Sequence, residues 1–232
     1  MNTFWRTALE VGSRCDRAGI AYCVIKTYGG DPQYNDGNVD LLVDRSLWDV
    51  YDAVLADDFR VSRRDRIKNR LYERNKLMGV AEQGDLAQIH LHRSVGWHNI
   101  CFMSAQDVLA RSTDVTFADG AVRVADKATE SRMFVLHIIF EQFAKNEWDL
   151  RFLCGRDFDD FADQFGVPPG VIAKVRDAGY GHLAFADLRP IWNRYYRNRR
   201  RETNISLWNR FLHWGLTRVQ QHRRRKAARQ SL

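Results

Sequence analysis

Asn38 and Asp40 stand one residue apart in a short segment that is otherwise apolar, running from Asn38 to Val43. On a β-strand, residues i and i+2 point to the same side, so both polar side chains would face a common ligand. An unpaired carboxylate inside an apolar run is costly. The position of Asp40 therefore indicates a functional role, such as binding a cation.

Two histidines, His90 and His92, repeat this spacing in a second segment, Leu86 to His92. If this segment is a strand beside the Asp40 strand, then Asp40, His90 and His92 could bind one transition-metal ion, because imidazole and carboxylate are common ligands of such ions. Two histidines at this spacing are also typical of a hydrogen-bond network. Both interpretations stay open.

A pair of glycines, Gly29 and Gly30, opens a polar loop that is rich in turn-forming residues and ends at Gly37. Backbone amides next to glycine can approach a phosphate closely, since no Cβ intervenes. Lys26, just before the pair, could neutralise phosphate charge. The alternatives are an ordinary loop and a solvated lysine at a strand end.

A sheet must hold these residues in place, and the hydrophobic pattern predicts one. A helix is expected over Thr3 to Ala18, with a stop at Gly19, and buried strands are expected over Ile20 to Ile25 and Val39 to Val43. The other predicted elements are a helix from Ser46 to Leu55 that begins with a capping pair, a hairpin of Lys76 to Ala81 with Leu86 to His92, a helix capped by Ser104, and a small hairpin over Phe117 to Val124.

After Asp126, a predicted helix cap, the pattern becomes helical almost throughout. The sequence therefore predicts an α/β (α+β) fold with a mixed α/β domain over residues 1–125. A helical domain with a basic C-terminal tail would follow over residues 126–232.

The composition is that of an ordinary globular protein, with 232 residues, 45% hydrophobic and 28% charged. No segment approaches the roughly 20 apolar residues of a transmembrane span, and the first residues lack a secretory signal. We therefore expect a cytoplasmic protein without a transmembrane segment. The four cysteines form no CxxC pair, so we expect buried thiols instead of a zinc knuckle or a disulfide framework.

The basic charge lies in the tail, where residues 189–232 hold 13 Lys and Arg against one acid, Glu202. The clusters Arg197 to Arg201 and Arg223 to Lys226 flank three aromatic residues, Trp208, Phe211 and Trp214. Such a segment could bind RNA or lie on an anionic membrane surface. Alternatively, the aromatic side chains pack inside the helical domain and the arginines are only solvated.

The glycine pair, the loop and the segment Asn38-Val39-Asp40-Leu41-Leu42-Val43 resemble the signature of the polymerase-β-like nucleotidyltransferase superfamily. The segment from Gln88 to Arg93 lies where a poorly characterised bacterial branch often has an Asp-Leu-His strand, and His137 before an aromatic residue also fits. This resemblance implies a mixed sheet with flanking helices, followed by an all-helical domain. It also implies Mg²⁺ or Mn²⁺ held by three acids, and transfer of a nucleoside monophosphate from an NTP to an acceptor.

Measured against that signature, the chain keeps one acid of three: Asn38 stands at the first position, Asp40 at the second and His90 at the third. Asp31 or Asp36 could substitute as a ligand, one transition metal could replace two magnesium ions, or the fold could bind without catalysis. The leading hypothesis is a divergent nucleotidyltransferase with an unknown acceptor. In it Asp40, Asn38 and His90 are catalytic, Asp40, His90 and His92 hold metal, and Gly29, Gly30 and Lys26 bind phosphate.

Overall fold

The computed structural model describes residues 1–35, 37–71, 73–81, 85–97 and 100–137, with scattered positions between 208 and 222. The chain divides into two compact units, Met1–Glu130 and Ser131–Leu232. The predicted boundary at residue 125 falls shortly before this division. Most of the predicted helical domain lies outside the described residues, and the fold below is that of the first unit.

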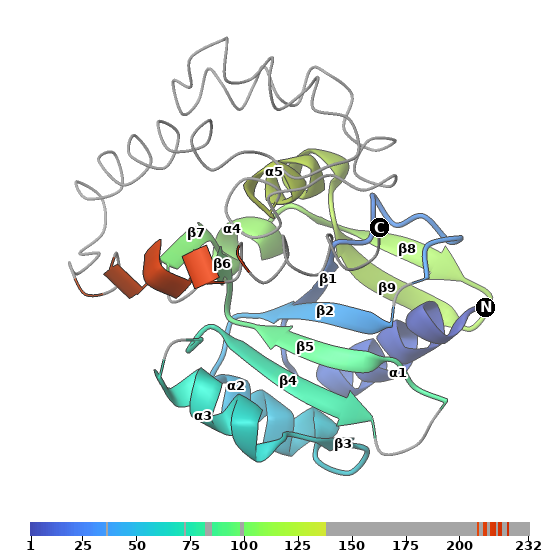
Figure 1. Ribbon diagram of the computed structural model, residues 1–232. Coiled ribbons are helices and arrows are strands. Elements are labelled where there is room, and N and C mark those ends of the chain that lie inside the picture. The colour runs from blue at the N-terminus through green and yellow to red at the C-terminus, as the bar shows by residue number, and fades with distance from the viewer. Residues whose placement is uncertain are drawn as a thin grey trace, which may run out of the picture. The chain divides into compact units, whose positions relative to one another are not determined.

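A seven-stranded mixed sheet forms the centre of this unit, in the order β3-β4-β5-β2-β1-β9-β8 (Figure 1). Its strands are β1 (Tyr22–Ile25), β2 (Asn38–Val43), β3 (Phe59–Arg60), β4 (Lys76–Ala81), β5 (Gln88–His92), β8 (Ser112–Phe117) and β9 (Gly120–Ala125). The central strand β2 pairs antiparallel with β1 and parallel with β5. The expected mixed sheet with flanking helices is confirmed.

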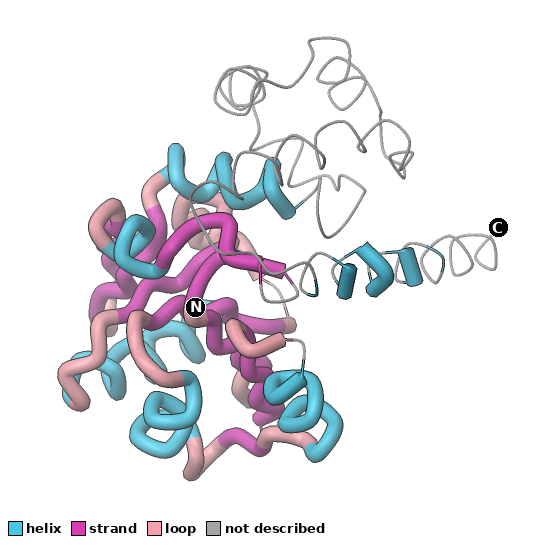
Figure 2. Tube along the Cα trace, turned by 90° about the vertical axis from the view of Figure 1, so that its left-hand side faces the viewer, coloured by secondary structure: helices cyan, strands magenta, loops and turns pink. Residues whose placement is uncertain are grey.

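Helices lie on both sides of the sheet (Figure 2). They are α1 (Thr3–Arg17), α2 (Leu47–Val50) with its π-helical continuation η1 (Tyr51–Leu55), α3 (Arg63–Leu71), α4 (Ala105–Leu109) and α5 (Lys127–His137). Two short strands, β6 (Ser94–Trp97) and β7 (Ile100–Ser104), form a separate ribbon. Helix α1 contacts β1, β2, β9 and η1, whereas α4 contacts β1 and β7.

The core lies where the two central strands meet α1. All of β1 is buried, and β2 is buried from Val39 onward. Helix α1 buries Phe4, Trp5, Ala8 and Val11 on its apolar face. The larger of these, such as Phe4 and Val11, each contribute about 1.5–3 kcal/mol by leaving water. Asp40, in the middle of β2, is itself buried.

The predicted ends of the helices are confirmed in part. Asn2 and Gly19 bound α1: the Asn2 side chain accepts a hydrogen bond from the Trp5 amide, and Gly19 has a left-handed φ of 62°. Ser104 caps α4 as predicted, accepting from the Asp107 amide. The capping pair predicted at Ser46 is wrong, because Ser46 makes no side-chain hydrogen bond to the helix.

Several elements were not predicted, namely α3, β3 and the ribbon of β6 and β7. The basic segment that becomes α3 buries only Asn69, so its sequence lacks an apolar stripe. The Asn69 side chain instead bonds Trp48, Glu73 and Lys76. Polar contacts, which have no sequence period, therefore hold this helix.

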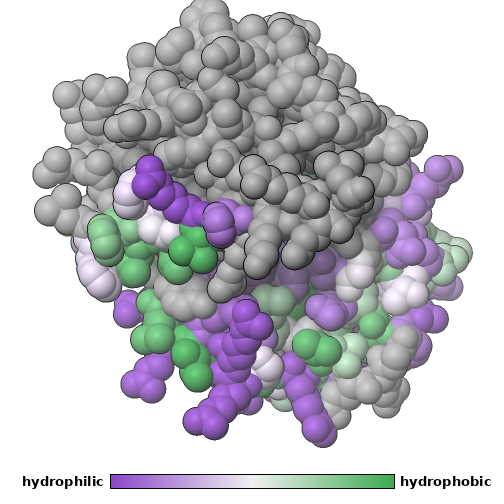
Figure 3. Space-filling model, viewed as in Figure 1, coloured by the Kyte–Doolittle hydropathy of each residue, from purple (hydrophilic) through white to green (hydrophobic). Residues whose placement is uncertain are grey.

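The described surface mixes hydrophilic and hydrophobic side chains on the face shown in Figure 3. Among the described residues, no helix has both the length and the apolar character that a membrane crossing requires. Cys15 and Cys23 are buried as expected, Cys101 is half-buried, and Cys154 lies outside the described residues.

Candidate metal and nucleotide site

Asp40 is the centre of a polar cluster inside the sheet. It lies in β2, only 5% exposed, directly opposite His90 of the parallel neighbour β5, while Leu42 is opposite His92. Because alternate residues of a strand share a face, both imidazoles reach the side of the sheet that carries Asp40. The predicted adjacency of the two strands is confirmed.

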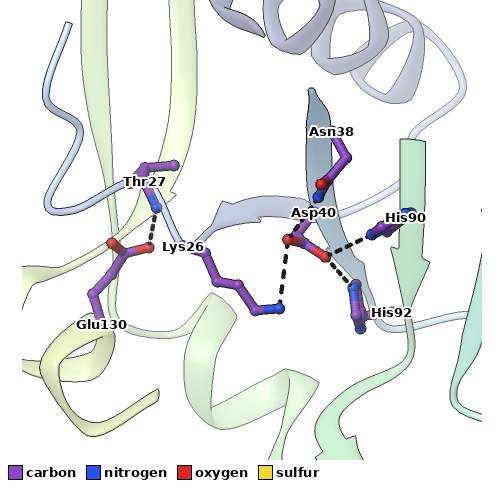
Figure 4. A network of polar contacts seen from close by, with 7 residues as sticks. All are labelled: Lys26, Thr27, Asn38, Asp40, His90, His92 and Glu130. Carbon is purple, nitrogen blue, oxygen red and sulfur yellow. Dashed lines mark hydrogen bonds and ion pairs between the residues drawn. The ribbon is translucent and has the colours of Figure 1, made fainter. Parts of the chain in front are cut away.

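One carboxylate oxygen of Asp40 faces both imidazoles (Figure 4). His92 Nε2 lies 2.6 Å from Asp40 Oδ1, a short hydrogen bond between buried groups. His90 Nδ1 lies 3.4 Å from the same oxygen. Each of the three residues offers one ligand atom, and these atoms all lie within 4.8 Å of one another, as a shared metal ion would require.

The second oxygen of Asp40 contacts two further predicted residues. The Lys26 ammonium lies 3.5 Å from Oδ2, and Asn38 Nδ2 donates to it at 3.1 Å. Lys26 follows β1, and Asn38 begins β2, two residues before Asp40. The structure thus brings Lys26, Asn38, His90 and His92 together around one carboxylate.

The electrostatics of the cluster favour an ionised Asp40 and a neutral His92. Burial acts to raise the pKa of Asp40, but the Lys26 charge and the hydrogen bonds of both imidazoles hold that pKa well below 3.8. Burial lowers the pKa of His92 to about 4, although Asp40 opposes this shift. At neutral pH, His92 is therefore an uncharged imidazole, the form that ligates metals.

His90 has an unused polar atom in this buried place. Its Nε2 is inaccessible to solvent and has no hydrogen-bond partner within the described part of the chain. Buried polar atoms are nearly always paired, and an orphaned one indicates a missing ligand, ion or water. Substrate or metal bound at the cluster would supply such a partner.

The acids needed for two magnesium ions are not assembled here. Among the described residues, Asp40 is the one carboxylate in the cluster, and Lys26 offsets its charge. Of the possible substitutes, the Asp31 carboxylate accepts from the Gln33 amide in its own turn, and Asp36 lies outside the described residues. Magnesium requires oxygen ligands in octahedral geometry, so this mixed nitrogen and oxygen set does not fit the pair.

The glycine turn is built differently from a free phosphate loop. Gly29 and Gly30 have left-handed φ values of 76° and 77°. The Gly29 amide donates to Glu130 Oε2 at 3.0 Å, and the Gly30 amide donates to Thr27 Oγ1 at 3.0 Å. The two amides that were predicted to face a phosphate therefore donate to groups of the protein. A Cβ on Gly30 would lie 2.4 Å from Val115, so close packing also requires this glycine.

Glu130 is a residue of this region that the sequence analysis missed. It is fully buried in the first turn of α5, and its Oε1 accepts from the Thr27 amide at 2.9 Å. Burial raises the pKa of Glu130 to about 7, although hydrogen bonds from Thr27, Gly29 and the Lys26 backbone oppose the shift. The available signal was the Asp126 cap, which accepts from the Thr129 amide and places Glu130 in the first turn.

The tail is described only at scattered positions. Trp208, Phe211 and Trp214 are exposed, and the Arg218 guanidinium lies 4.0 Å from the centre of the Trp214 ring. The alternative in which these aromatic side chains are packed in a core is therefore wrong for the three described. The side chain of His137 and the two arginine clusters lie outside the described residues.

Comparison with known proteins gives two structural likenesses at low sequence identity. No family model matches the chain, and no curated protein matches it. The chain is similar to the solution structure of the antibiotic-resistance factor ANT(2'')-Ia, with 10% identity, a TM-score of 0.47, and coverage of 85% of this chain and 100% of that one. It is also similar to an antigenic nucleotidyltransferase-like protein from Paracoccidioides brasiliensis, with 12% identity, a TM-score of 0.38, and coverage of 85% and 88%.

At TM-scores of 0.47 and 0.38, these two likenesses carry no conclusion about this chain. The chemistry of the site is therefore inferred from the side chains around Asp40.

Proposed function

We propose that this chain is a divergent nucleotidyltransferase with a single metal ion, bound by Asp40, His90 and His92. The observation that carries the proposal is the convergence of these three side chains, with ligand atoms within 4.8 Å of one another. They come from two hydrogen-bonded strands, with Asp40 directly opposite His90 and with His92 two residues further along the same strand. The sequence resemblance supplies the reaction type, and the cluster supplies the site.

The ligand set favours a transition metal. Two imidazoles and one carboxylate suit ions such as Zn²⁺, Mn²⁺ or Fe²⁺ better than Mg²⁺, which prefers oxygen ligands. Of the two ions expected from the resemblance, Mn²⁺ is the better match. Binding requires His92 to give up its 2.6 Å contact with Asp40 or to use its other ring nitrogen.

Lys26 is the group proposed to bind the phosphates of an NTP. Its side chain is 20% exposed, and its ammonium already lies beside the buried Asp40. In the transfer, an acceptor oxygen would bond to the α-phosphorus while the bond to the departing pyrophosphate breaks. Lys26 would stabilise the charge on the phosphates, and Asn38 would orient Asp40 through their hydrogen bond. A phosphate could reach the Gly29 amide only by displacing Glu130.

A second candidate is a nucleotide-binding protein without catalysis. The specific observation in its favour is that Asp40 already has partners on both oxygens, from His90 and His92 on one side and Lys26 and Asn38 on the other. A carboxylate satisfied in this way is stable without a metal ion. The same cluster would then bind a nucleotide mainly through Lys26.

The test is to incubate the protein with each labelled NTP and with Zn²⁺, Mn²⁺ or Mg²⁺, and to measure pyrophosphate release and transferred label. We expect activity with a transition metal that is lost in Asp40→Ala and kept in Asp44→Ala, since Asp44 is an exposed acid just beyond β2. Product formation that survives Asp40→Ala would contradict catalysis at this site. Stabilisation by an NTP without any turnover would favour the binding protein.

A further inference from the structure

A buried carboxylate on α5 holds the turn that carries Lys26. The turn contains two non-glycine residues with left-handed backbones, Lys26 at φ 63° and Tyr28 at φ 55°, followed by two left-handed glycines. Each non-glycine residue in this region costs roughly 1–2 kcal/mol. Such a conformation persists only where the surroundings impose it.

Glu130 supplies that constraint. Its two oxygens accept from the amides of Thr27 and Gly29, at 2.9 and 3.0 Å, and the Thr27 hydroxyl also bonds to it. The Thr27 hydroxyl in turn accepts from the Gly30 amide. Successive amides that converge on one acceptor group form a nest, and here the acceptor is a carboxyl group of the protein itself.

The backbone of this turn and the Lys26 side chain contact different acids, as Figure 4 shows. The backbone at Thr27 faces Glu130, whereas the side chain of the preceding residue, Lys26, reaches Asp40. Because Lys26 is adjacent in the chain to the residue that Glu130 anchors, the direction of its side chain depends on the turn. Glu130 does not contact the metal cluster itself among the interactions described.

We propose that Glu130 is a positioning residue that fixes the turn from Lys26 to Gly30 and so holds the Lys26 ammonium beside Asp40. The net charge at the candidate site then depends on a residue from a distant part of the chain. The expected effects of Glu130 on metal and phosphate binding rest on the proposed function. The coupling of Glu130 to Lys26 stands on the contacts alone.

The position of the Lys26 ammonium should affect metal binding and phosphate binding in opposite directions. An ammonium 3.5 Å from Asp40 opposes the binding of a cation and supports the binding of a polyphosphate. Loss of the Glu130 anchor should therefore strengthen Zn²⁺ binding and weaken NTP binding. A merely structural defect would weaken both.

The first experiment needs no metal. Acetylation of Lys26 with limiting acetic anhydride is followed by mass spectrometry, with the exposed Lys127 of α5 as an internal reference. In folded Glu130→Gln, where an amide group replaces one acceptor oxygen, we expect Lys26 to react several-fold faster relative to Lys127. Thr129→Val is the matched control, because Thr129 is buried on the same helix and its hydroxyl has no partner in the described region.

The second experiment is a double-mutant cycle on Zn²⁺ affinity with Lys26→Met and Glu130→Gln. If Glu130 acts through Lys26, each single variant binds Zn²⁺ several-fold tighter, and the double variant binds no tighter than Lys26→Met. Folded Glu130→Gln with unchanged Lys26 reactivity, or with an effect additive to Lys26→Met, would overturn the proposal.

A milder variant covers the case in which Glu130→Gln does not fold. Thr27→Val removes the hydroxyl that joins Glu130 to Gly30, and the Lys26 acetylation rate should rise by a smaller factor. An unchanged rate in this variant would then count against the proposal. If none of the variants binds Zn²⁺, the proposed function fails, while the acetylation result still decides the role of Glu130.

Discussion

Among the described residues of this unit, two carboxyl groups are almost completely buried, yet their pKa values shift in opposite directions. Asp40, on β2, keeps a pKa well below 3.8, whereas the pKa of Glu130, on α5, rises to about 7. Asp40 lies beside the Lys26 ammonium and two imidazoles, but the donors described around Glu130 are neutral groups of the turn. Burial is similar in both places, so the presence of a full positive charge decides which acid stays ionised.

The largest effect should come from removing the charge of Asp40. Asp40→Asn keeps the shape but leaves Lys26 without its counterion and removes the anionic ligand, so Zn²⁺ affinity should fall on the order of 100-fold. Competition with a chromophoric chelator measures the change. Asp44→Asn is the control, and equal losses in both variants would contradict a specific site at Asp40.

The raised pKa of Glu130 predicts that its contribution to stability declines at higher pH. The folded-state pKa of about 7 exceeds the ordinary glutamate value of 4.5, so the folded state holds this proton more tightly. The contribution is complete below about pH 4.5 and is lost as the pH rises through 7, by about 3 kcal/mol. Urea unfolding between pH 4.5 and 8 should show this decline relative to Glu130→Gln, and parallel curves for the two proteins would refute it.

His92 should produce the opposite slope. Its folded-state pKa of about 4 lies below the ordinary histidine value of 6.5, so the unfolded state binds the proton more tightly. The stability from a neutral His92 is complete above pH 6.5 and declines as the pH falls through 4, by at most about 3 kcal/mol. The free energy of unfolding of His92→Gln, measured over the same range, should lack this decline. An NMR signal assigned to His92 that titrates near 6.5 would contradict the shift.

The smallest effect concerns the neutral donors around Glu130. Thr27→Val removes the acceptor of the Gly30 amide and one donor to Glu130, which should lower the free energy of unfolding by about 1 kcal/mol. Thr129→Val, with no described side-chain hydrogen bond to lose, should be nearly neutral. A larger loss in Thr129→Val than in Thr27→Val would reverse the ranking of the two positions.

The sequence was sufficient to predict the central strands and one side of the Asp40 cluster. Apolar runs and turn residues were sufficient for β1, β2 and the pairing of β4 with β5, because each lies in a short, strongly patterned segment. The adjacency of Asp40 and His90 followed from the family signature. Both are short-range or motif-based inferences.

The burial of Glu130, and its hydrogen bond from the Gly29 amide, could not be predicted in the same way. The contact between them joins residues 101 apart in the chain, and it depends on where α5 begins relative to the sheet. A glutamate in the first turn of a helix is common, and nothing in the sequence distinguishes one that enters the core. Helix α3 escaped prediction for a related reason, since its buried contacts are polar.

The parallel pairing of β2 with β5 has a consequence for the specificity of folding. A slip of one residue between these strands would turn His90 and His92 to the opposite face and leave Asp40 buried without them. Apolar neighbours such as Leu41 and Leu91 tolerate a slip far better than a carboxylate does. Asp40, His90 and His92 therefore also favour one register of β2 and β5 over the registers that are shifted by one residue.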